Sequence, residues 1–381
     1  MLESLRRLGA TDETILAAMS KVPRHRFVER FWWAPPAEGW SREGALAFDA
    51  TPHGFSDQAL RATYEPTSAL LTPLPSGQTR ATSSLSAPII VASMLEEMHL
   101  EPNLRVLEIG TGSGYNAALL AELVGDPNLV TSIDLDPGLT DEATDRLERM
   151  GCGRFVVRCG DGADGVADRA PFDRIVATVG CTDISPAWLE QMEDHGELLV
   201  PLEHGAMHPR VEIRRSADGI RGRFVGRSAF LRMQGFQADR QLWTGDMTYP
   251  EEPTWTPLPS SVAAAFAGDA ADLGTKRRLS DFSTYLSIRD RRAGSVLGLG
   301  DGMSIAFMRE SLLGHAGPDG SELALRLLAI AHDWIELGCP GLDRYDMRFL
   351  PLGGAPPPTD SPDGPWSIDR IDYRQDVSLL S

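Results

Sequence analysis

The stretch Val106-Leu-Glu-Ile-Gly-Thr-Gly-Ser-Gly-Tyr-Asn-Ala117 decides the fold. Its apolar start, residues 105–109, predicts a strand, and residues 116–123 predict a helix directly after three glycines. Glycine lets the chain reverse tightly and lets a ligand approach the backbone without meeting a Cβ. The spacing Gly-x-Gly-x-Gly is tighter than the Gly-x-Gly-x-x-Gly of dinucleotide-binding folds. The stretch therefore predicts a strand, a tight turn and a helix, with a small ligand bound at the turn.

The next apolar run, Val130-Thr-Ser-Ile-Asp134, ends in a carboxylate. In a doubly wound sheet, an acid at the tip of the second strand can accept both ribose hydroxyls of a nucleoside. We expect Asp134 to take this place because it ends the apolar run, and Asp136 is the alternative.

Three further strands are predicted at 154–159, 172–178 and 196–201. The first of them leads into Gly160-Asp161-Gly162, where an Asp can hydrogen-bond an adenine amino group. Each motif alone could be an ordinary surface acid or a turn. Because they occur in order at the carboxyl ends of successive strands, we predict an α/β fold with a doubly wound, Rossmann-like sheet.

Composition limits the possible functions. The chain has 381 residues, 42% of them apolar, which is enough for two domains of a globular protein. The net charge of −18 disfavours nucleic acid as a partner, because phosphate binding requires a basic surface. No apolar run approaches the roughly 18 residues of a membrane span, so we expect a cytoplasmic protein with no membrane partner. The four cysteines lack metal-ligand spacing, and no metal site is expected.

Four ranges describe the predicted organisation. Residues 1–60 form an N-terminal helical cap, 61–86 a substrate loop, 87–247 the ligand-binding core and 248–381 a smaller C-terminal α+β domain. Within these ranges we predict a helix at 87–98, strands at 282–288, 295–299 and 303–308, a helix at 321–337 that Gly338 ends, and C-terminal strands led by Trp366 and ending at 377–380. The proline-rich stretch 248–259 separates the last two ranges.

Several motifs together resemble a known family. Glu108 followed by Gly110-x-Gly-x-Gly114 is similar to motif I of class I S-adenosylmethionine (SAM) methyltransferases. With Val22-Pro-Arg-x-x-Phe-Val28 and Ser86-x-Pro-x-x-Val-Ala92, the chain resembles protein-L-isoaspartate O-methyltransferases over about residues 10–235. The resemblance implies a class I SAM-dependent methyltransferase fold, with SAM as cofactor and S-adenosylhomocysteine (SAH) as product.

The same resemblance implies the site residues. The family's serine corresponds to Ser86, whose hydroxyl can orient the acceptor carboxylate, and Ser84 and Ser83 are weaker candidates. The alternative is that Ser86 only caps the helix that Pro88 begins. The expected cofactor-binding residues are Glu108, Gly110, Thr111, Gly112, Ser113, Gly114, Tyr115, Asp134, Asp161 and Gly162.

Two departures from the family pattern affect the expected substrate. Gly77-Gln-Thr79 is separated from Ser86-Ala-Pro88 by residues 80–85, and the chain is longer than the repair enzymes. The longer arrangement resembles a branch found in actinobacterial clusters that mature ribosomally made peptides. It implies a cyclised graspetide, lanthipeptide or lasso precursor as partner, with an aspartyl side chain that is methylated and then forms aspartimide and isoaspartate. The C-terminal domain would then recognise the peptide.

Two other functions stay open. One is repair of isoaspartyl residues in damaged proteins, and the other is a non-catalytic scaffold with a SAM-binding fold. The glycines, Asp134 and Asp161 disfavour the scaffold. A carboxylate acceptor is ionised at pH 7 and requires no strong general base, so a structural or solvent-exposed role is expected for His195 and His332.

Overall fold

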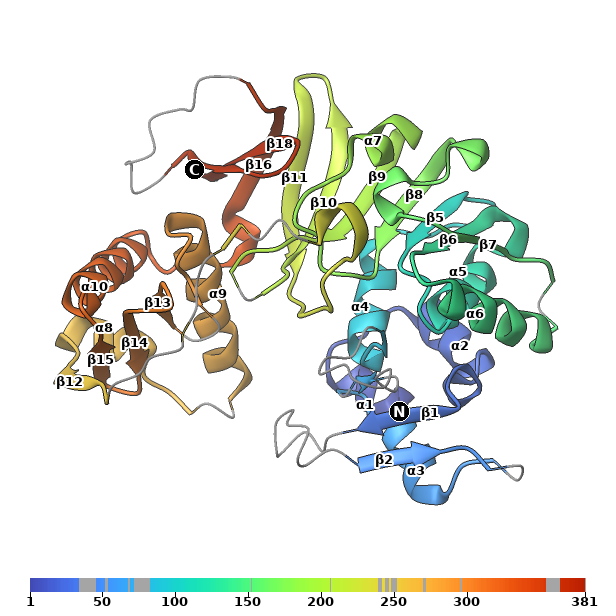
Figure 1. Ribbon diagram of the computed structural model, residues 1–381, viewed down its shortest axis with the longest axis horizontal. Coiled ribbons are helices and arrows are strands. Elements are labelled where there is room, and N and C mark those ends of the chain that lie inside the picture. The colour runs from blue at the N-terminus through green and yellow to red at the C-terminus, as the bar shows by residue number, and fades with distance from the viewer. Residues whose placement is uncertain are drawn as a thin grey trace. The chain divides into compact units, whose positions relative to one another are not determined.

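The computed structural model describes most of the chain (Figure 1). The residues that it does not describe are 34–45, 52–53, 68, 72–82, 152, 206, 239–241, 244–246, 248–251, 270–271, 295–296, 354–363 and 381. Gly77-Gln-Thr79, the first half of the 80–85 stretch and the start of the proline-rich stretch therefore lie outside the described residues.

The chain divides into two compact units. The first unit comprises Met1–Val179, Ser185–Leu199 and Leu231–Phe236, and the second comprises Gly180–Ile184, Val200–Phe230 and Gln237–Ser381. This division differs from the predicted ranges 87–247 and 248–381, because residues 200–230 group with the C-terminal segment. The physical reason is strand pairing within the second unit, where Ile220 lies opposite Phe349.

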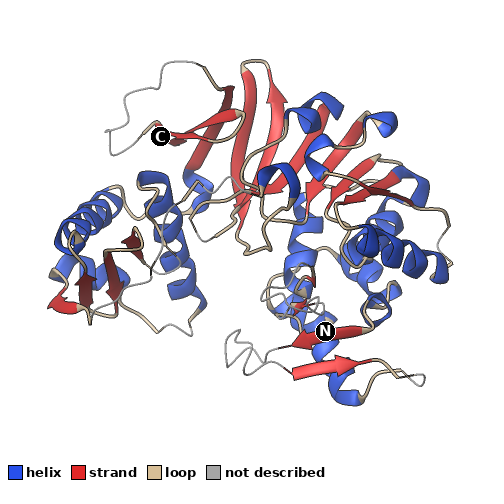
Figure 2. Ribbon diagram, viewed as in Figure 1, coloured by secondary structure: helices blue, strands red, loops and turns tan. Residues whose placement is uncertain are grey.

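The first unit contains a parallel sheet with the strand order β9-β8-β5-β6-β7. Its strands are β5 (Val106–Ile109), β6 (Val130–Asp134), β7 (Val156–Cys159), β8 (Phe172–Ala177) and β9 (Met192–Pro201). Figure 2 shows helices flanking these strands. The chain order reverses between β5 and β8, and ligands bind at such a point, at the carboxyl ends of the strands. The predicted doubly wound sheet is confirmed.

Helices connect these strands. They are α4 (Pro88–Glu97), α5 (Tyr115–Val124), α6 (Pro137–Arg149) and α7 (Pro186–Gln191). Four short 3-10 helices accompany them, η3 (Pro127–Leu129), η4 (Gly162–Asp164), η5 (Ala167–Arg169) and η6 (Gly235–Gln237), the last at the boundary between the units. All four residues of β5 are buried, as expected for a parallel strand that is covered on both faces.

The N-terminal residues form more than the predicted helical cap. The helices are α1 (Leu2–Arg7), α2 (Glu13–Lys21), η1 (Arg24–Phe27) and α3 (Asp57–Thr63). Between and after them lie β1 (Arg30–Trp33), β2 (Leu46–Asp49), β3 (Leu70–Leu71) and β4 (Ser84–Leu85), an antiparallel sheet with the order β2-β1-β3-β4. The prediction of helices alone for residues 1–60 is therefore incomplete. These strands have only two to four residues, too few to show a clear period of two.

The second unit contains two sets of strands, of which only the second is a complete sheet. One has the antiparallel order β17-β18-β16-β11-β10, with β10 (Arg210–Ser216), β11 (Gly219–Gly226), β16 (Tyr345–Pro351), β17 (Trp366–Asp369) and β18 (Tyr373–Leu379). The other has the order β12-β15-β14-β13, with β12 (Thr254–Pro257), β13 (Gly298–Gly300), β14 (Ile305–Arg309) and β15 (Leu312–Ala316). The helices of this unit are α8 (Ser260–Phe266), α9 (Leu273–Arg289), α10 (Gly320–Glu336) and η7 (Leu342–Arg344). The helix predicted at 321–337 is confirmed by α10, and Gly338 follows it with φ of 79°.

The strand predicted at 282–288 is wrong, because these residues form the second half of α9. Phe282, Tyr285 and Leu286 are buried and lie three and four residues apart, the spacing of one helical face. Asp272 begins the helix by accepting a hydrogen bond from Thr275 N at 2.7 Å. The aromatic residues suggested a strand, but their spacing and the cap favour a helix.

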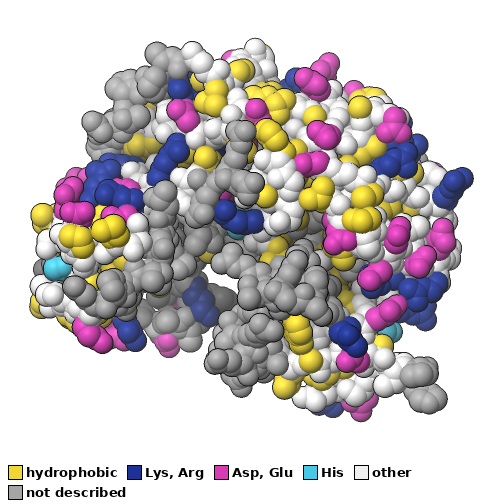
Figure 3. Space-filling model, in the orientation of Figure 1, with side chains coloured by type: hydrophobic (Ala, Val, Ile, Leu, Met, Phe, Trp, Pro, Cys, Tyr) yellow, Lys and Arg dark blue, Asp and Glu magenta, His cyan; other side chains and the backbone are white. Residues whose placement is uncertain are grey.

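Of the helices that the structure describes, none combines the length and the apolar composition that a bilayer crossing requires. On the face drawn in Figure 3, acidic and basic side chains are interspersed over the described surface. Together with the net charge of −18, this surface is unlike the basic stripe that nucleic-acid binding requires.

Candidate functional site

The glycines of the turn after β5 take backbone conformations that other residues avoid. Gly110, Gly112 and Gly114 have φ of 97°, 50° and 83°. A Cβ at Gly110 would lie 2.8 Å from Thr178 Oγ1, and one at Gly114 would lie 3.3 Å from Ala143 Cβ. Thr178 also donates a hydrogen bond to Gly110 O at 2.7 Å. The turn thus packs between neighbouring elements and keeps its backbone free of side chains.

The structure distinguishes the two candidate acids after β6. Asp134 accepts a hydrogen bond through Oδ2 from Gly112 N at 2.8 Å, so its carboxylate lies at the glycine turn. Asp136 is the N-cap of α6 and accepts from Gly138 N at 2.8 Å and Leu139 N at 3.2 Å. The geometry favours Asp134 for a ligand hydroxyl and gives Asp136 the role of a helix cap.

Glu108 lies in the interior beneath the turn. Its carboxylate accepts hydrogen bonds from Asn116 Nδ2 at 2.9 Å and from Ser132 Oγ at 2.6 Å, and Thr111 Oγ1 lies 2.6 Å from the same Ser132 Oγ. Burial raises the pKa of Glu108 to about 7, and the nearby Asp134 adds to the rise. Both of its oxygens are hydrogen-bonded to the strand and the helix around the turn, so Glu108 supports the turn from the protein interior.

The residues that follow Gly112 are also mostly internal. Thr111 and Ser113 are buried, and Ser113 Oγ accepts a hydrogen bond from Tyr115 N at 3.3 Å. The ring of Tyr115 packs against Phe27, with centroids 5.4 Å apart, and burial raises its pKa to about 12. The structure thus gives the Tyr115 side chain a supporting place rather than one on the ligand side.

Asp161 and Gly162 lie where β7 ends. Asp161 accepts hydrogen bonds from Ala163 N at 2.9 Å and from Phe236 N at 2.7 Å, which fixes the segment around Gly235. A Cβ at Gly162 would lie 2.6 Å from Ile109 Cγ2, so glycine is required for packing against the end of β5. Each oxygen of Asp161 accepts one backbone N–H and retains a lone pair for a ligand donor.

The predicted serines lie on the segment that enters α4. A Cβ at Gly112 would lie 3.4 Å from Ser83 Oγ and 3.8 Å from Ser84 O, so this segment borders the glycine turn. Ser86 precedes Ala87, which is the N-cap of α4 and makes no side-chain cap. The alternative that Ser86 is the helix cap is therefore wrong.

A buried arginine connects this segment to the glycine turn. Arg24 donates from Nη2 to Leu85 O at 3.0 Å and from Nε to Thr63 O at 2.9 Å, and its guanidinium lies over the ring of Tyr115, 5.4 Å from the centroid. Burial lowers its pKa to about 10. Arg24 belongs to the Val22-Pro-Arg motif, but no role could be predicted for it, because only the fold brings Leu85 and Tyr115 together.

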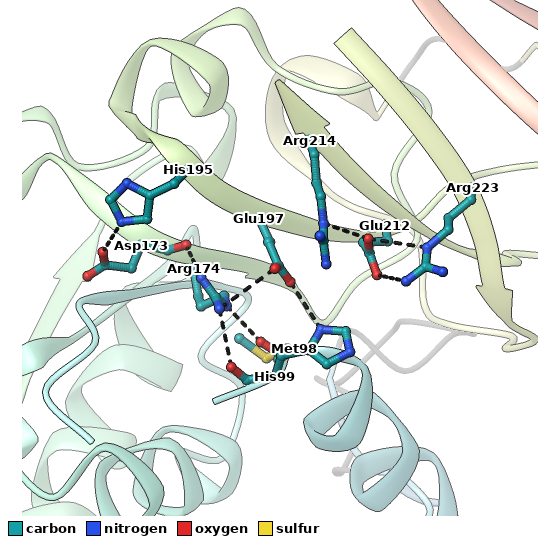
Figure 4. Close-up of polar contacts among 9 residues, drawn as sticks. All are labelled: Met98, His99, Asp173, Arg174, His195, Glu197, Glu212, Arg214 and Arg223. Atoms are coloured by element: carbon teal, nitrogen blue, oxygen red, sulfur yellow. Dashed lines mark hydrogen bonds and ion pairs between the residues drawn. The ribbon is translucent and has the colours of Figure 1, made fainter. Parts of the chain in front are cut away.

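The other end of α4 is fixed as well (Figure 4). Arg174 on β8 donates to Met98 O at 2.7 Å and to His99 O at 3.2 Å. Glu197 on β9 lies 3.2 Å from His99 Nδ1 and 3.7 Å from Arg174 Nη2. Contacts at both ends therefore hold α4, and with it the serine segment at its start. His195 Nε2 lies 3.3 Å from Asp173 Oδ1, and the His195 side chain is exposed.

Comparison with known proteins identifies the family. The model of the protein-L-isoaspartate(D-aspartate) O-methyltransferase family matches residues 55–233. The curated protein-L-isoaspartate O-methyltransferase of Methanopyrus kandleri is 34% identical over 243 residues, which cover 62% of this chain and 92% of the relative. The chain belongs to the protein-L-isoaspartate O-methyltransferase family. The enzyme of the same name from Serratia proteamaculans is 38% identical over 220 residues, 58% of this chain and 88% of the relative.

Family membership makes the chain a SAM-dependent protein carboxyl O-methyltransferase, and the resemblance stated from the motifs is confirmed at this level. A solved protein-L-isoaspartate O-methyltransferase structure aligns with 100% of this chain and 98% of its own length, with a TM-score of 0.54 and 19% identity. That likeness shows a shared fold over the whole chain. The curated relatives match only about three fifths of the chain, so the rest is additional to them.

The glycine turn and the carboxylate beside it suit SAM in shape and in chemistry. The glycine backbone can approach a ligand closely, and the Asp134 carboxylate beside it suits ribose hydroxyls. The negative charge of Asp134 also suits a cofactor that carries a positively charged sulfonium.

Gly112→Val should raise the dissociation constant for SAH by about 100-fold or more, about 2.7 kcal/mol. The valine would have to adopt φ of 50° and would crowd Ser83. Gly125→Val is the matched control, because Gly125 also has positive φ but has nothing within 4 Å of an added Cβ. Isothermal titration should show normal SAH affinity for the control. Equal affinity in a folded Gly112→Val variant would place the cofactor elsewhere.

Glu108→Gln should remove a pH dependence of stability. A carboxyl with a folded pKa of about 7, above its usual 4.5, contributes stability that is fully present below 4.5 and is lost as pH rises through 7. Between pH 5 and 8, the free energy of unfolding of the ligand-free parent should therefore fall relative to Glu108→Gln by about 1–3 kcal/mol. Urea unfolding of both proteins at each pH measures this difference. Parallel pH profiles would show that Glu108 ionises normally in the fold.

Proposed function

We propose that this enzyme methylates the free α-carboxylate of L-isoaspartyl residues in proteins and peptides. The observation that carries the proposal is its 34% identity over 92% of the length of a curated protein-L-isoaspartate O-methyltransferase. The glycine turn beside Asp134 supports it, since it matches the cofactor that such an enzyme uses. Repair of damaged proteins is thus the function that the sequence relatives favour.

The cofactor would be held by residues that already border the turn. We propose that the backbone of Gly110, Gly112 and Gly114 faces the amino-acid part of SAM, and that Asp134 accepts the ribose hydroxyls. Asp161 would accept from the adenine amino group through its remaining lone pairs. Glu108, Thr111, Ser113, Tyr115 and Gly162 would shape this cradle from behind it.

Methyl transfer to a carboxylate requires no strong acid or base from the protein. SAM supplies an electrophilic methyl group and the ionised acceptor carboxylate supplies the attacking oxygen, so that transfer leaves SAH and a methyl ester. No proton has to be removed, because a carboxylate with a pKa of about 4 is already ionised at pH 7. The residues therefore have to align the two reactants and exclude water.

We propose Ser86 as the residue that orients the acceptor. Its hydroxyl is not used as a helix cap, and it follows Leu85, whose carbonyl Arg24 holds. Ser83 lies closer to the glycine turn, which suits a role beside the cofactor. Ser84 lies between them on β4, and we assign it to the same segment without a separate role.

A second candidate is methylation of an aspartyl side chain in a modified, ribosomally made precursor peptide. The observation that favours it is the additional two fifths of the chain, which could recognise a larger acceptor. The solved structure weakens this argument, because its fold extends over the same C-terminal part. An acceptor assay separates the two candidates.

The enzyme should methylate a synthetic peptide with one L-isoaspartyl residue, seen as a mass gain of one methyl group followed by loss of methanol. The identical peptide with L-aspartate should react at least about 100-fold more slowly in kcat/KM, because its only free carboxylate is on the side chain. SAH binding by the same preparation serves as the control for folded enzyme. Preference for an aspartyl residue in a cyclised precursor would instead establish the second candidate.

Ser86→Ala should lower kcat on the isoaspartyl peptide by about 5–150-fold, the loss of one hydrogen bond of about 1–3 kcal/mol in the transition state. SAH affinity should stay within a factor of two. Ser83→Ala is the matched variant and should shift SAH affinity more than kcat, because Ser83 borders Gly112. A parallel fall of rate and SAH affinity in Ser86→Ala would make Ser86 part of the cofactor site.

A further inference from the structure

Two loops of the second unit lie side by side where β8 and β9 have ended. Residues 180–184 follow β8 in the chain, and residues 202–204 follow β9. Cys181 N donates to Pro201 O at 2.8 Å, and Glu203 N donates to Cys181 O at 2.8 Å. Loops at the carboxyl ends of parallel strands are where α/β enzymes place their ligands.

A single side chain from the C-terminal hairpin joins both loops. Arg370 lies in the turn between β17 and β18 and is 5% exposed. It donates to Thr182 O at 2.6 Å in the first loop and to Glu203 O at 3.1 Å in the second. Its Nη2 also lies 3.1 Å from His204 Nε2.

The 180–184 loop accepts further hydrogen bonds from the same hairpin through Asp183. Asp183 accepts from Asp372 N at 2.6 Å in the same β17–β18 turn and from Tyr373 N at 3.1 Å at the start of β18. It also accepts from Ile184 N at 2.8 Å within its own loop. In each of these contacts between the two segments, the β17–β18 hairpin donates the hydrogen bond and the 180–184 loop accepts it.

The arginine is held firmly in this place. Gln375 Oε1 accepts from both Nε and Nη2, at 2.9 Å and 2.6 Å, and the guanidinium lies 5.4 Å from the ring centroid of Trp243. Burial lowers the pKa of Arg370 to about 9, which still leaves it charged at neutral pH. Removing the side chain would leave the buried carbonyls of both loops without this donor, which is costly in an interior.

We propose that Arg370 is a positioning residue for methyl transfer, through which the β17–β18 turn holds the loops that follow β8 and β9. Arg370 lies outside the matched family range of 55–233, so the additional sequence contributes directly to the architecture of the enzyme. A chain cut near residue 250 would lose both this contact and the strand β16 that pairs with β11. The kinetic part of the inference depends on the proposed function.

The first test does not require a substrate. Hydrogen exchange is measured on the full chain for the parent, Arg370→Lys, Arg370→Met and the control Arg348→Met, whose side chain is exposed on β16. Both Arg370 variants should exchange at least tenfold faster in residues 180–184 and 202–204. Exchange in β5 and β6, and SAH affinity, should stay as in the parent, and the control should change neither loop.

The second test uses a synthetic L-isoaspartyl peptide well below the unfolding temperature of each variant. Arg370→Met should lower kcat/KM for the peptide by at least tenfold with the KM for SAM unchanged, and Arg370→Lys should recover part of the loss. If Arg370→Met does not fold, Arg370→Lys alone carries both tests. Arg370 would have only a structural role if hydrogen exchange became faster across the whole protein. The same conclusion would follow if exchange became faster in the two loops but the kinetics stayed unchanged. If the parent does not methylate the peptide, the proposed function fails while the exchange result still decides whether Arg370 holds the loops.

Discussion

The structure depends on one constraint, the close approach of neighbouring elements to the turn Gly110-Thr-Gly-Ser-Gly114. Each of its three glycines has positive φ, and a Cβ at Gly110 would meet Thr178 at 2.8 Å. Only glycine therefore fits at these positions, and a backbone without side chains lets a cofactor approach closely. Asp134 adds a carboxylate at the same place through its bond to Gly112 N.

Buried residues of the first unit fix what surrounds this turn. Glu108 fills the space beneath it, and Arg24 holds the serine segment by Leu85 O while it lies over Tyr115. In the second unit, Arg370 performs a comparable task for the loops after β8 and β9. Both arginines are buried and bond backbone carbonyls, which suits a reaction that depends on alignment rather than on proton transfer.

The sequence predicted the parallel sheet well because β5, β6 and β7 are short runs that end in an acid or lead directly into a glycine, a local signal. It favoured Asp134 over Asp136 by position, and the structure adds that Asp136 caps α6. The strand predicted at 282–288 was wrong because aromatic residues fit both periods, and only burial of Phe282, Tyr285 and Leu286 reveals the helical face. Arg24 and Arg370 could not be found as site supports, since their partners lie up to 188 residues away in the chain. The repair function was predicted as an alternative, and the relatives favour it over the peptide-maturation reading.

A crystal structure of the full chain with SAH and an L-isoaspartyl peptide tests the central claim most directly. We expect the ribose within hydrogen-bond distance of Asp134, the amino-acid part of SAH against Gly110 and Gly112, and the peptide's α-carboxylate between the SAH sulfur and the Ser86 hydroxyl. A ribose bound by Asp136, or a peptide whose carboxylate lies away from the sulfur, would contradict it.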